Sequence, residues 1–280
     1  MLGKLFKYDM RALSRPLVVL HLVVVALGVV ATICGVVGWT IGEAPQPGYQ
    51  AESFYTLAMM GVVVGMVFSV AGVLCAPPAT LVIIIHRFYR SLFTDEGYLT
   101  FTLPVPNASH LLSKTLAGLI WLAIDFVVVF ACALSVSGAI FGYGSGFDLA
   151  DSLPMWFLST IGVAFGDWQG SPAWGFAQLS VGAVSTLATA YLAFTLGAIW
   201  ASRHKVAAGI GLFAVITWGS GLILSLLSAA VTVGAASLAV SDGHVAVMVW
   251  RATALFLEVA KAAAFLAICA WLFNRKVNLP

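Results

Sequence analysis

Residues Arg87–Pro106 read RFYRSLFTDEGYLTFTLPVP, and this polar and aromatic segment separates two long apolar runs. The run before it is Leu57–Ile85, and the run after it is Leu111–Phe141. Each run exceeds the roughly 20 apolar residues that carry a helix across a bilayer. Two membrane-spanning helices need only a turn between them. A connection this elaborate therefore predicts a surface that another protein contacts.

The composition of the whole chain is that of a membrane protein. Of its 280 residues, 61% are hydrophobic and only 9% are charged, and the mean hydropathy is +1.04. A soluble domain carries about 25% charged residues. The net charge of +2, with no basic block, argues against a nucleic-acid partner. All four cysteines lie in apolar runs without CxxC spacing, so we expect buried thiols and no disulfide framework.

Six apolar runs are long enough to span a membrane, which predicts an all-α polytopic membrane protein. We expect residues 1–16 to form an amphipathic interfacial helix and residues 17–280 to form a single six-span transmembrane domain. The run 206–240 is predicted to end its span near residue 227 and to continue as a short re-entrant or interfacial piece. Residues 149–165 are predicted to form an interfacial helix on the outer surface. The expected spans are 17–41, 57–85, 111–141, 174–202, 206–227 and 245–273.

The basic residues predict the orientation of these spans. Eleven of the 13 lysines and arginines fall before the first span, between the second and third or just inside the third, between the fourth and fifth, or after the sixth. The alternate connections contain no lysine or arginine and carry acidic residues instead. Because basic loops stay in the cytoplasm, both termini are expected there. The basic residues concerned are Lys4, Lys7, Arg11, Arg15, Arg87, Arg90, Lys114, Arg203, Lys205, Arg275 and Lys276.

The amino-terminal segment, residues 2–15, has the pattern of a helix that lies in the headgroup layer. Its four basic residues form one stripe at helical spacing, and its apolar residues lie opposite them. Pro16 is expected to redirect the chain into the first span. The segment is either an anchor that only sets the topology or a mechanical elbow helix. Asp9 lies in the apolar arc, so we expect a basic or backbone partner for its carboxylate.

Four charged residues lie within the apolar runs, where an unpaired charge is costly. At about 1.5 Å per residue, Asp125 lies roughly 16 Å above Lys114, and Lys261 lies roughly 21 Å above Arg275. These depths predict a salt bridge between Asp125 and Lys261, in a polar cluster that also contains Glu258. The cluster is either a clamp between helices or a substrate contact. The fourth residue, Arg251, is expected to snorkel outward.

The second span carries Ala76-Pro77-Pro78, and two prolines predict a kink there. The kink is either a fixed bend or a hinge between the cytoplasmic segment and the span above it. The chain has no P-loop, no HExxH and no GxSxG motif. We therefore expect a membrane protein that is not itself an enzyme and that holds no metal or cofactor.

Two segments together resemble the permease subunits of bacterial ABC-2 type transporters. The first is Lys7-Tyr8-Asp9-Met10-Arg11, which follows a short apolar start. The second runs from Arg87 through Thr-Asp-Glu-Gly-Tyr to Leu-Pro-Val, and Ser113-Lys114 and Trp121 follow it. It is similar to the cytoplasmic connection after the second span in small permeases of Gram-positive bacteria. The resemblance is specific in these two segments, whereas the six-span plan covers the whole chain.

The resemblance implies a permease subunit of an exporter in the bacterial cytoplasmic membrane, paired with a second permease subunit in a dimer. A separate ATPase subunit would bind ATP and magnesium, and a cytoplasmic coupling helix within Phe88–Phe101 would contact it. The exported compound would be hydrophobic or amphipathic. Two alternatives remain, a proton-coupled secondary transporter with Asp125 and Glu258 as its relay and a non-transporting scaffold or sensor. The expected coupling residues are Arg87, Arg90, Asp95, Glu96 and Tyr98.

Overall fold

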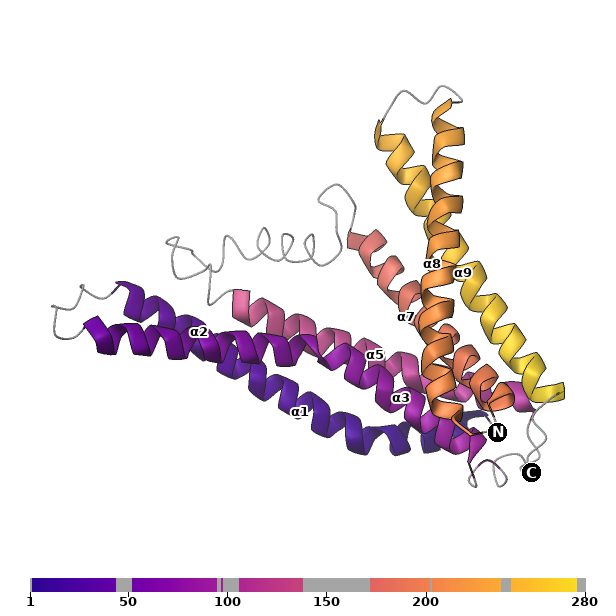
Figure 1. Ribbon diagram of the computed structural model, residues 1–280, viewed down its shortest axis with the longest axis horizontal. Coiled ribbons are helices and arrows are strands. Elements are labelled where there is room, and N and C mark those ends of the chain that lie inside the picture. Colours follow the sequence, from indigo (N-terminus) through magenta and orange to yellow (C-terminus); the bar gives the residue numbers. More distant parts are fainter. Residues whose placement is uncertain are drawn as a thin grey trace. The chain divides into compact units, whose positions relative to one another are not determined.

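The computed structural model describes residues 2–43, 52–94, 97, 106–137, 172–201, 203–237 and 243–275, and these are almost entirely helical. Among these residues, six helical segments are long and apolar enough to cross a membrane, with α2 and α3 forming one of them. The expected all-α architecture with six candidate spans is therefore confirmed. In chain order the helices are α1 (Leu2–Glu43), α2 (Glu52–Leu74), α3 (Ala76–Phe93), α5 (Asn107–Ser137), α7 (Pro172–Trp200), α8 (Lys205–Ser237) and α9 (Gly243–Arg275) (Figure 1).

The second span is broken where its prolines predict. α2 ends at Leu74, Cys75 forms a turn, and α3 begins at Ala76. Pro77 and Pro78 have no N–H, so they cannot donate to the carbonyl groups four residues earlier. The helical hydrogen bonds resume with the N–H of Ala79, which donates to the carbonyl of Cys75 at 3.2 Å.

The first helix is longer than the sequence predicts. α1 runs from Leu2 to Glu43 and remains helical through Pro16, and the change of direction expected there stays a prediction. A proline inside a helix removes one hydrogen bond, and two leucines close to Pro16 are buried. Leu13 and Leu17 flank Pro16 and are 4% and 0% exposed.

The fifth span also differs from its prediction. α8 continues without a break to Ser237, whereas the sequence predicts an end near residue 227. Its glycines weaken a helix by about 1 kcal/mol each but do not end it. At 33 residues the helix is about 50 Å long, which exceeds the hydrocarbon thickness. The predicted interfacial helix at 149–165 lies outside the described residues.

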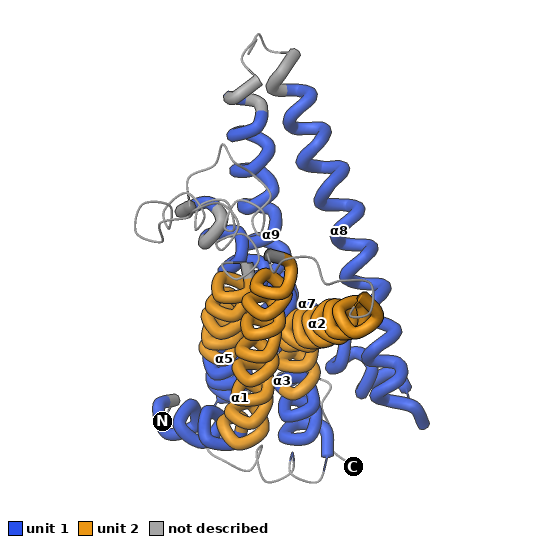
Figure 2. The backbone as a smooth tube through the Cα atoms, turned by 90° about the vertical axis from the view of Figure 1, so that its left-hand side faces the viewer, with its two compact units in different colours: residues 1–12, 84–119, 171–280 blue, residues 13–83, 120–170 orange. Residues whose placement is uncertain are grey.

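The chain divides into two compact units (Figure 2). Unit 1 comprises residues 1–12, 84–119 and 171–280, and unit 2 comprises residues 13–83 and 120–170. In unit 1, α7, α8 and α9 pack against one another pairwise. In unit 2, Val24 of α1, Val73 of α2, Ala76 of α3 and Cys132 of α5 form a buried cluster.

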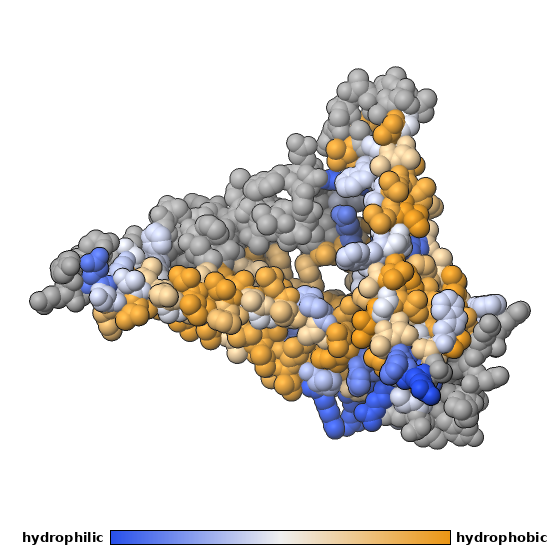
Figure 3. Space-filling model, in the orientation of Figure 1, coloured by the Kyte–Doolittle hydropathy of each residue, from blue (hydrophilic) through white to orange (hydrophobic). Residues whose placement is uncertain are grey.

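The helix surfaces are apolar, as a bilayer requires. Large hydrophobic side chains lie exposed on most of the helices, including Phe54 (77% exposed), Phe68 (74%) and Trp218 (79%). Hydrophobic residues cover much of the helix surface visible in Figure 3. The four cysteines are free thiols. Cys132 and Cys269 are buried as expected, whereas Cys34 is partly buried and Cys75 is exposed.

Glycines let the helices approach closely in both units. In unit 2, a Cβ on Gly65 would lie 3.1 Å from the Cys34 sulfur, and one on Gly72 would lie 2.5 Å from a Leu27 methyl group. Gly61, four residues before Gly65, has open space around it. Close packing therefore occurs at Gly65 and Gly72 and not at Gly61.

The closest helix approach in unit 1 gives a stability prediction. A Cβ on Gly197 of α7 would lie 2.6 Å from the backbone nitrogen of Gly209 on α8, so the two backbones would have to move apart. We expect Gly197→Ala to destabilise the protein by about 1–3 kcal/mol. Gly211→Ala is the matched control, because nothing lies within 4 Å of its Cβ position. It should be neutral or should stabilise α8 by up to about 1 kcal/mol. Thermal unfolding in detergent measures both, and equal shifts would contradict the close approach.

Candidate functional site

Aromatic side chains from α7 and α9 hold the carboxyl-terminal end of α3 in unit 1. Phe88 stacks on Tyr191 with ring centroids 4.0 Å apart, and both side chains are almost fully buried. Near the helix end, the rings of Phe93 and Phe273 have centroids 6.0 Å apart. Such aromatic pairs contribute about 0.5–1.5 kcal/mol each beyond the burial of their surface. The segment that follows α3 therefore starts from a fixed position within this unit.

The coupling helix expected within Phe88–Phe101 does not begin as a separate element. Phe88–Phe93 form the last turns of α3, because their apolar side chains continue its buried face. Beyond α3 the chain turns, and the N–H of Gly97 donates to the Thr94 carbonyl at 2.7 Å. A Cβ on Gly97 would lie 2.5 Å from the Leu92 carbonyl oxygen, so this turn requires glycine.

Only two of the five expected coupling residues fall in the part that the structure describes. Arg87 and Arg90 lie on the last two turns of α3, next to the aromatic cluster. Both make further contacts. The other three lie outside the described residues, and these are Asp95, Glu96 and Tyr98.

Asp9 has the basic partner that the sequence predicts. Its carboxylate accepts a hydrogen bond from the Lys114 ammonium at 3.0 Å and another from the Ser113 hydroxyl at 2.6 Å. Lys114 is 9% exposed and Ser113 is fully buried. The Tyr191 hydroxyl donates to the Lys114 carbonyl at 3.3 Å. This network joins the start of α1 to the start of α5 and to α7.

The helix ends that carry basic residues converge within unit 1. Asp9 joins the beginning of α1 to the beginning of α5. Tyr89 packs against Phe194 near the end of α7, and Phe93 packs against Phe273 near the end of α9. These are the ends that the distribution of lysine and arginine predicts on one side of the membrane. That this side is the cytoplasm remains a prediction.

Two of the predicted intramembrane charges pair with each other in unit 1. The Lys261 ammonium lies 2.8 Å from Oε2 of Glu258, one turn away on α9. The Ser185 hydroxyl of α7 donates to the same oxygen at 2.6 Å. Glu258 and Lys261 therefore meet as the helical spacing predicts. Arg251 is half-buried on α9 and makes further contacts, and its outward orientation stays a prediction.

Asp125 has partners in unit 2 that the sequence reasoning did not assign to it. It is 2% exposed, and its Oδ1 accepts a hydrogen bond from the Thr80 hydroxyl at 3.1 Å. Nε2 of His21 lies 3.3 Å from the same oxygen. Lys261 in unit 1 pairs with Glu258, and the expected bridge from Asp125 to Lys261 stays a prediction. His21 could have been found as one of the few ionisable side chains within the first apolar run.

His21 is held between two acceptors on different helices. Nδ1 of His21 lies 2.6 Å from the Leu17 carbonyl oxygen of the preceding turn, and Nε2 faces the Asp125 carboxylate. The Trp121 ring packs on His21, with ring centroids 5.9 Å apart.

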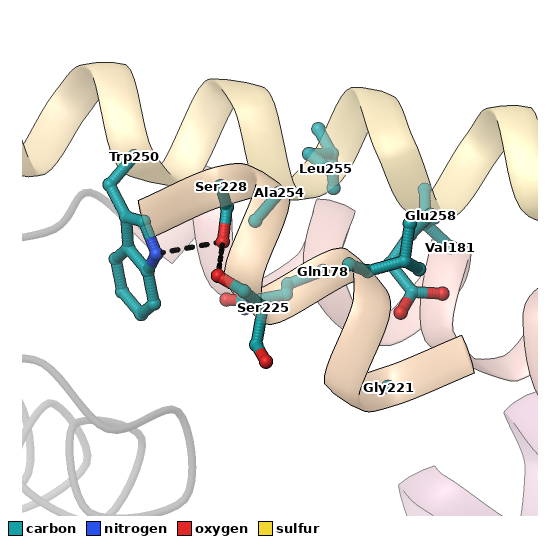
Figure 4. Close-up of a pocket in the computed structure, with 10 residues that line it drawn as sticks. Gln178, Val181, Gly221, Ser225, Ser228, Trp250, Ala254, Leu255 and Glu258 are labelled. Atoms are coloured by element: carbon teal, nitrogen blue, oxygen red, sulfur yellow. Dashed lines mark hydrogen bonds between the residues drawn. The ribbon is translucent and has the colours of Figure 1, made fainter. Parts of the chain in front are cut away.

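A cleft of about 210 Å³ opens between α7, α8 and α9 in unit 1. Most of its polar lining comes from α8 and α9, where the Trp250 indole N–H donates to the Ser228 hydroxyl at 3.2 Å. That hydroxyl in turn donates to the Ser225 carbonyl at 2.9 Å. Gln178 and Glu258 complete the polar lining, as Figure 4 shows.

No family model, no curated protein and no solved structure matches this chain. Within the described residues, no group of three or more metal-binding side chains comes together.

Proposed function

We propose that the chain is the permease subunit of a bacterial ATP-binding cassette exporter in the cytoplasmic membrane. Two permease subunits pair, and each contacts a separate ATPase subunit that binds ATP and magnesium. The pair moves a hydrophobic or amphipathic compound across the membrane. The observation that carries the proposal is the aromatic cluster at the end of α3, which fixes the helix that leads into the polar segment 94–106.

The helical path from that segment into the membrane suggests how force is transmitted. α3 is a continuous helix of 18 residues, about 27 Å long, between the break at Cys75 and the turn after Phe93. A helix of this length moves as one body when its end is displaced. A partner that pushes on the segment after Phe93 would therefore move α3, together with the helices that its aromatic side chains contact. ATP would drive this movement only if the partner in one conformation bound ATP more tightly than in the other.

Contact with an ATPase can be tested by site-specific cross-linking. We expect Thr94→Cys, at the exposed end of α3, to form a cross-link to a co-expressed ATPase encoded next to this gene. Glu52→Cys, at the start of α2 and predicted on the opposite membrane side, is the matched control. The wild-type chain sets the background from its four native cysteines. Equal cross-linking of both variants, or none at Thr94→Cys, would contradict the proposal.

The predicted contact residues give a functional test. Replacing Asp95, Glu96 and Tyr98 together with alanine should lower transport at least about tenfold, equivalent to about 1.4 kcal/mol of lost coupling. ATP hydrolysis by the partner should persist, because the chain has no P-loop of its own. Efflux and phosphate release from proteoliposomes measure the two activities. If the triple variant transports as much compound per ATP hydrolysed as the wild-type chain, the proposed contact is contradicted.

One observation favours a second candidate, a proton-driven transporter. His21 and Asp125 are buried within candidate spans and lie 3.3 Å apart, and such ionisable groups occur in proton relays. This alternative predicts transport that follows a pH gradient without nucleotide. Transport that stops when the ATPase is omitted, whatever the pH gradient, excludes it.

A further inference from the structure

The cleft between α7, α8 and α9 places polar groups on faces that otherwise pack apolar side chains. On α9, Trp250, Ala254 and Glu258 follow one another at helical spacing and line one wall. On α8, Ser225 and Ser228 line another wall. Three helices thus contribute to one polar stripe, which is more than the packing of apolar helices requires.

The position of Glu258 places this stripe deep within the membrane region. Glu258 lies 17 residues before Arg275, about 25 Å along α9, and α9 has 33 residues in all. It is therefore near the middle of the helix. A polar group at that depth usually faces a cavity or a partner. Glu258 does both, since it lines the cleft and also pairs with Lys261.

The bonding of Glu258 leaves one carboxylate oxygen for a ligand. Oε2 accepts from both Ser185 and Lys261. Among the described residues, no contact to Oε1 is recorded. The side chain is 35% exposed, whereas Asp125 in unit 2 is only 2% exposed. An ion pair that only stabilises the fold does not need a carboxylate that is exposed to a ligand.

We propose that this cleft binds an amphiphilic amine. The ammonium group donates to Oε1 of Glu258, at the opposite end of the cleft from Trp250 (Figure 4). The apolar part of the ligand packs on Val181, Leu224 and Leu255, which also line the cleft. The Lys261 ammonium pairs with Oε2 and orients the carboxylate. Its positive charge also competes with the ammonium group of the ligand for the Glu258 carboxylate. The inference that such an amine is the transported compound rests on the proposed function. Binding of the amine to the cleft can be measured without any ATPase.

The test compares two probes of equal chain length on the full chain in nanodiscs. Octylammonium carries the cationic head, and octanol is its neutral counterpart. Empty nanodiscs correct for partition into lipid. We expect saturable binding of octylammonium that Glu258→Gln weakens about tenfold, because a charge-assisted hydrogen bond is lost. Octanol binding should change less than about twofold. The control Glu52→Gln removes an exposed carboxylate elsewhere and should change neither.

Lys261 separates ligand binding from a purely structural ion pair. In the proposal, Lys261→Gln keeps or increases the affinity for octylammonium, because the competing charge is gone. In a structural clamp, Lys261→Gln and Glu258→Gln would lower binding equally, and that result would overturn the proposal. The double variant Glu258→Gln with Lys261→Gln leaves no unpaired charge, so it keeps the test valid if either single variant fails to fold. It should still lose the preference for octylammonium over octanol.

The remaining outcomes are equally decisive. Absence of saturable octylammonium binding to the wild-type chain would overturn the inference. So would equal effects of Glu258→Gln on both probes. Because the assay contains no ATPase, either failure leaves the cross-linking result at Thr94 unaffected. The inference and the proposed function therefore fail separately.

Discussion

Replacing Asp9 with alanine is expected to destabilise the protein by about 3–5 kcal/mol, because it leaves a buried lysine charge without its partner. Lys114 is 9% exposed, and its ammonium group lies 3.0 Å from the Asp9 carboxylate. The buried Ser113 hydroxyl would lose its acceptor as well. For a chain of this size the apparent Tm in detergent should fall by roughly 10 °C.

Two controls separate the ion pair from a general effect of substitution. The double variant Asp9→Leu with Lys114→Met removes both charges and fills the space with apolar atoms, so it should recover most of the lost stability. Glu52→Ala removes an exposed carboxylate and should change stability by less than about 0.5 kcal/mol. If Asp9→Ala behaves like Glu52→Ala, the pair does not stabilise the fold.

The spans were predictable because a bilayer leaves a long apolar run few alternatives to a helix. Their bounds shifted by a few residues, as between the expected 174–202 and the observed α7. Pro16 was not predictable in the same way. A proline predicts a lost hydrogen bond, but α1 nevertheless continues as one helix from Leu2 to Glu43.

The sequence predicted which type of partner a charged residue needs, but not which residue that partner is. The apolar surroundings of Asp9 demand a basic partner, but nothing in the local spacing identifies Lys114, 105 residues away. Glu258 and Lys261 were predictable because they lie one turn apart on one helix. For Asp125 the estimated depth matched Lys261. Depth gives the height of a side chain along a helix and not the direction in which it points, so it did not identify His21 and Thr80, which contact Asp125 within unit 2.

The largest effect within unit 2 is expected from Asp125→Leu. The substitution removes the carboxylate that accepts from the Thr80 hydroxyl and lies 3.3 Å from Nε2 of His21, and both residues are buried. We expect a loss of about 3–5 kcal/mol, as for other buried pairs that lose one partner. Asp125→Asn should cost less, because its amide oxygen still accepts from Thr80. A double-mutant cycle with His21→Phe should give a coupling energy of about 1–3 kcal/mol, and additive losses would contradict the pairing.

The same substitution distinguishes a fixed bend from a hinge at the break between α2 and α3. Thr80 lies two residues beyond Pro78, so its bond to Asp125 ties the start of α3 to α5 directly after the break. If the break is a hinge restrained by this bond, hydrogen exchange at the Ala79 and Thr80 amides should accelerate in Asp125→Leu, while exchange in the middle of α8 stays unchanged. If the prolines alone fix the bend, exchange at these amides should stay at the wild-type rate. A hinge would let α3 move separately from α2 in the proposed coupling to an ATPase, whereas a fixed bend would require α2 and α3 to move as one body.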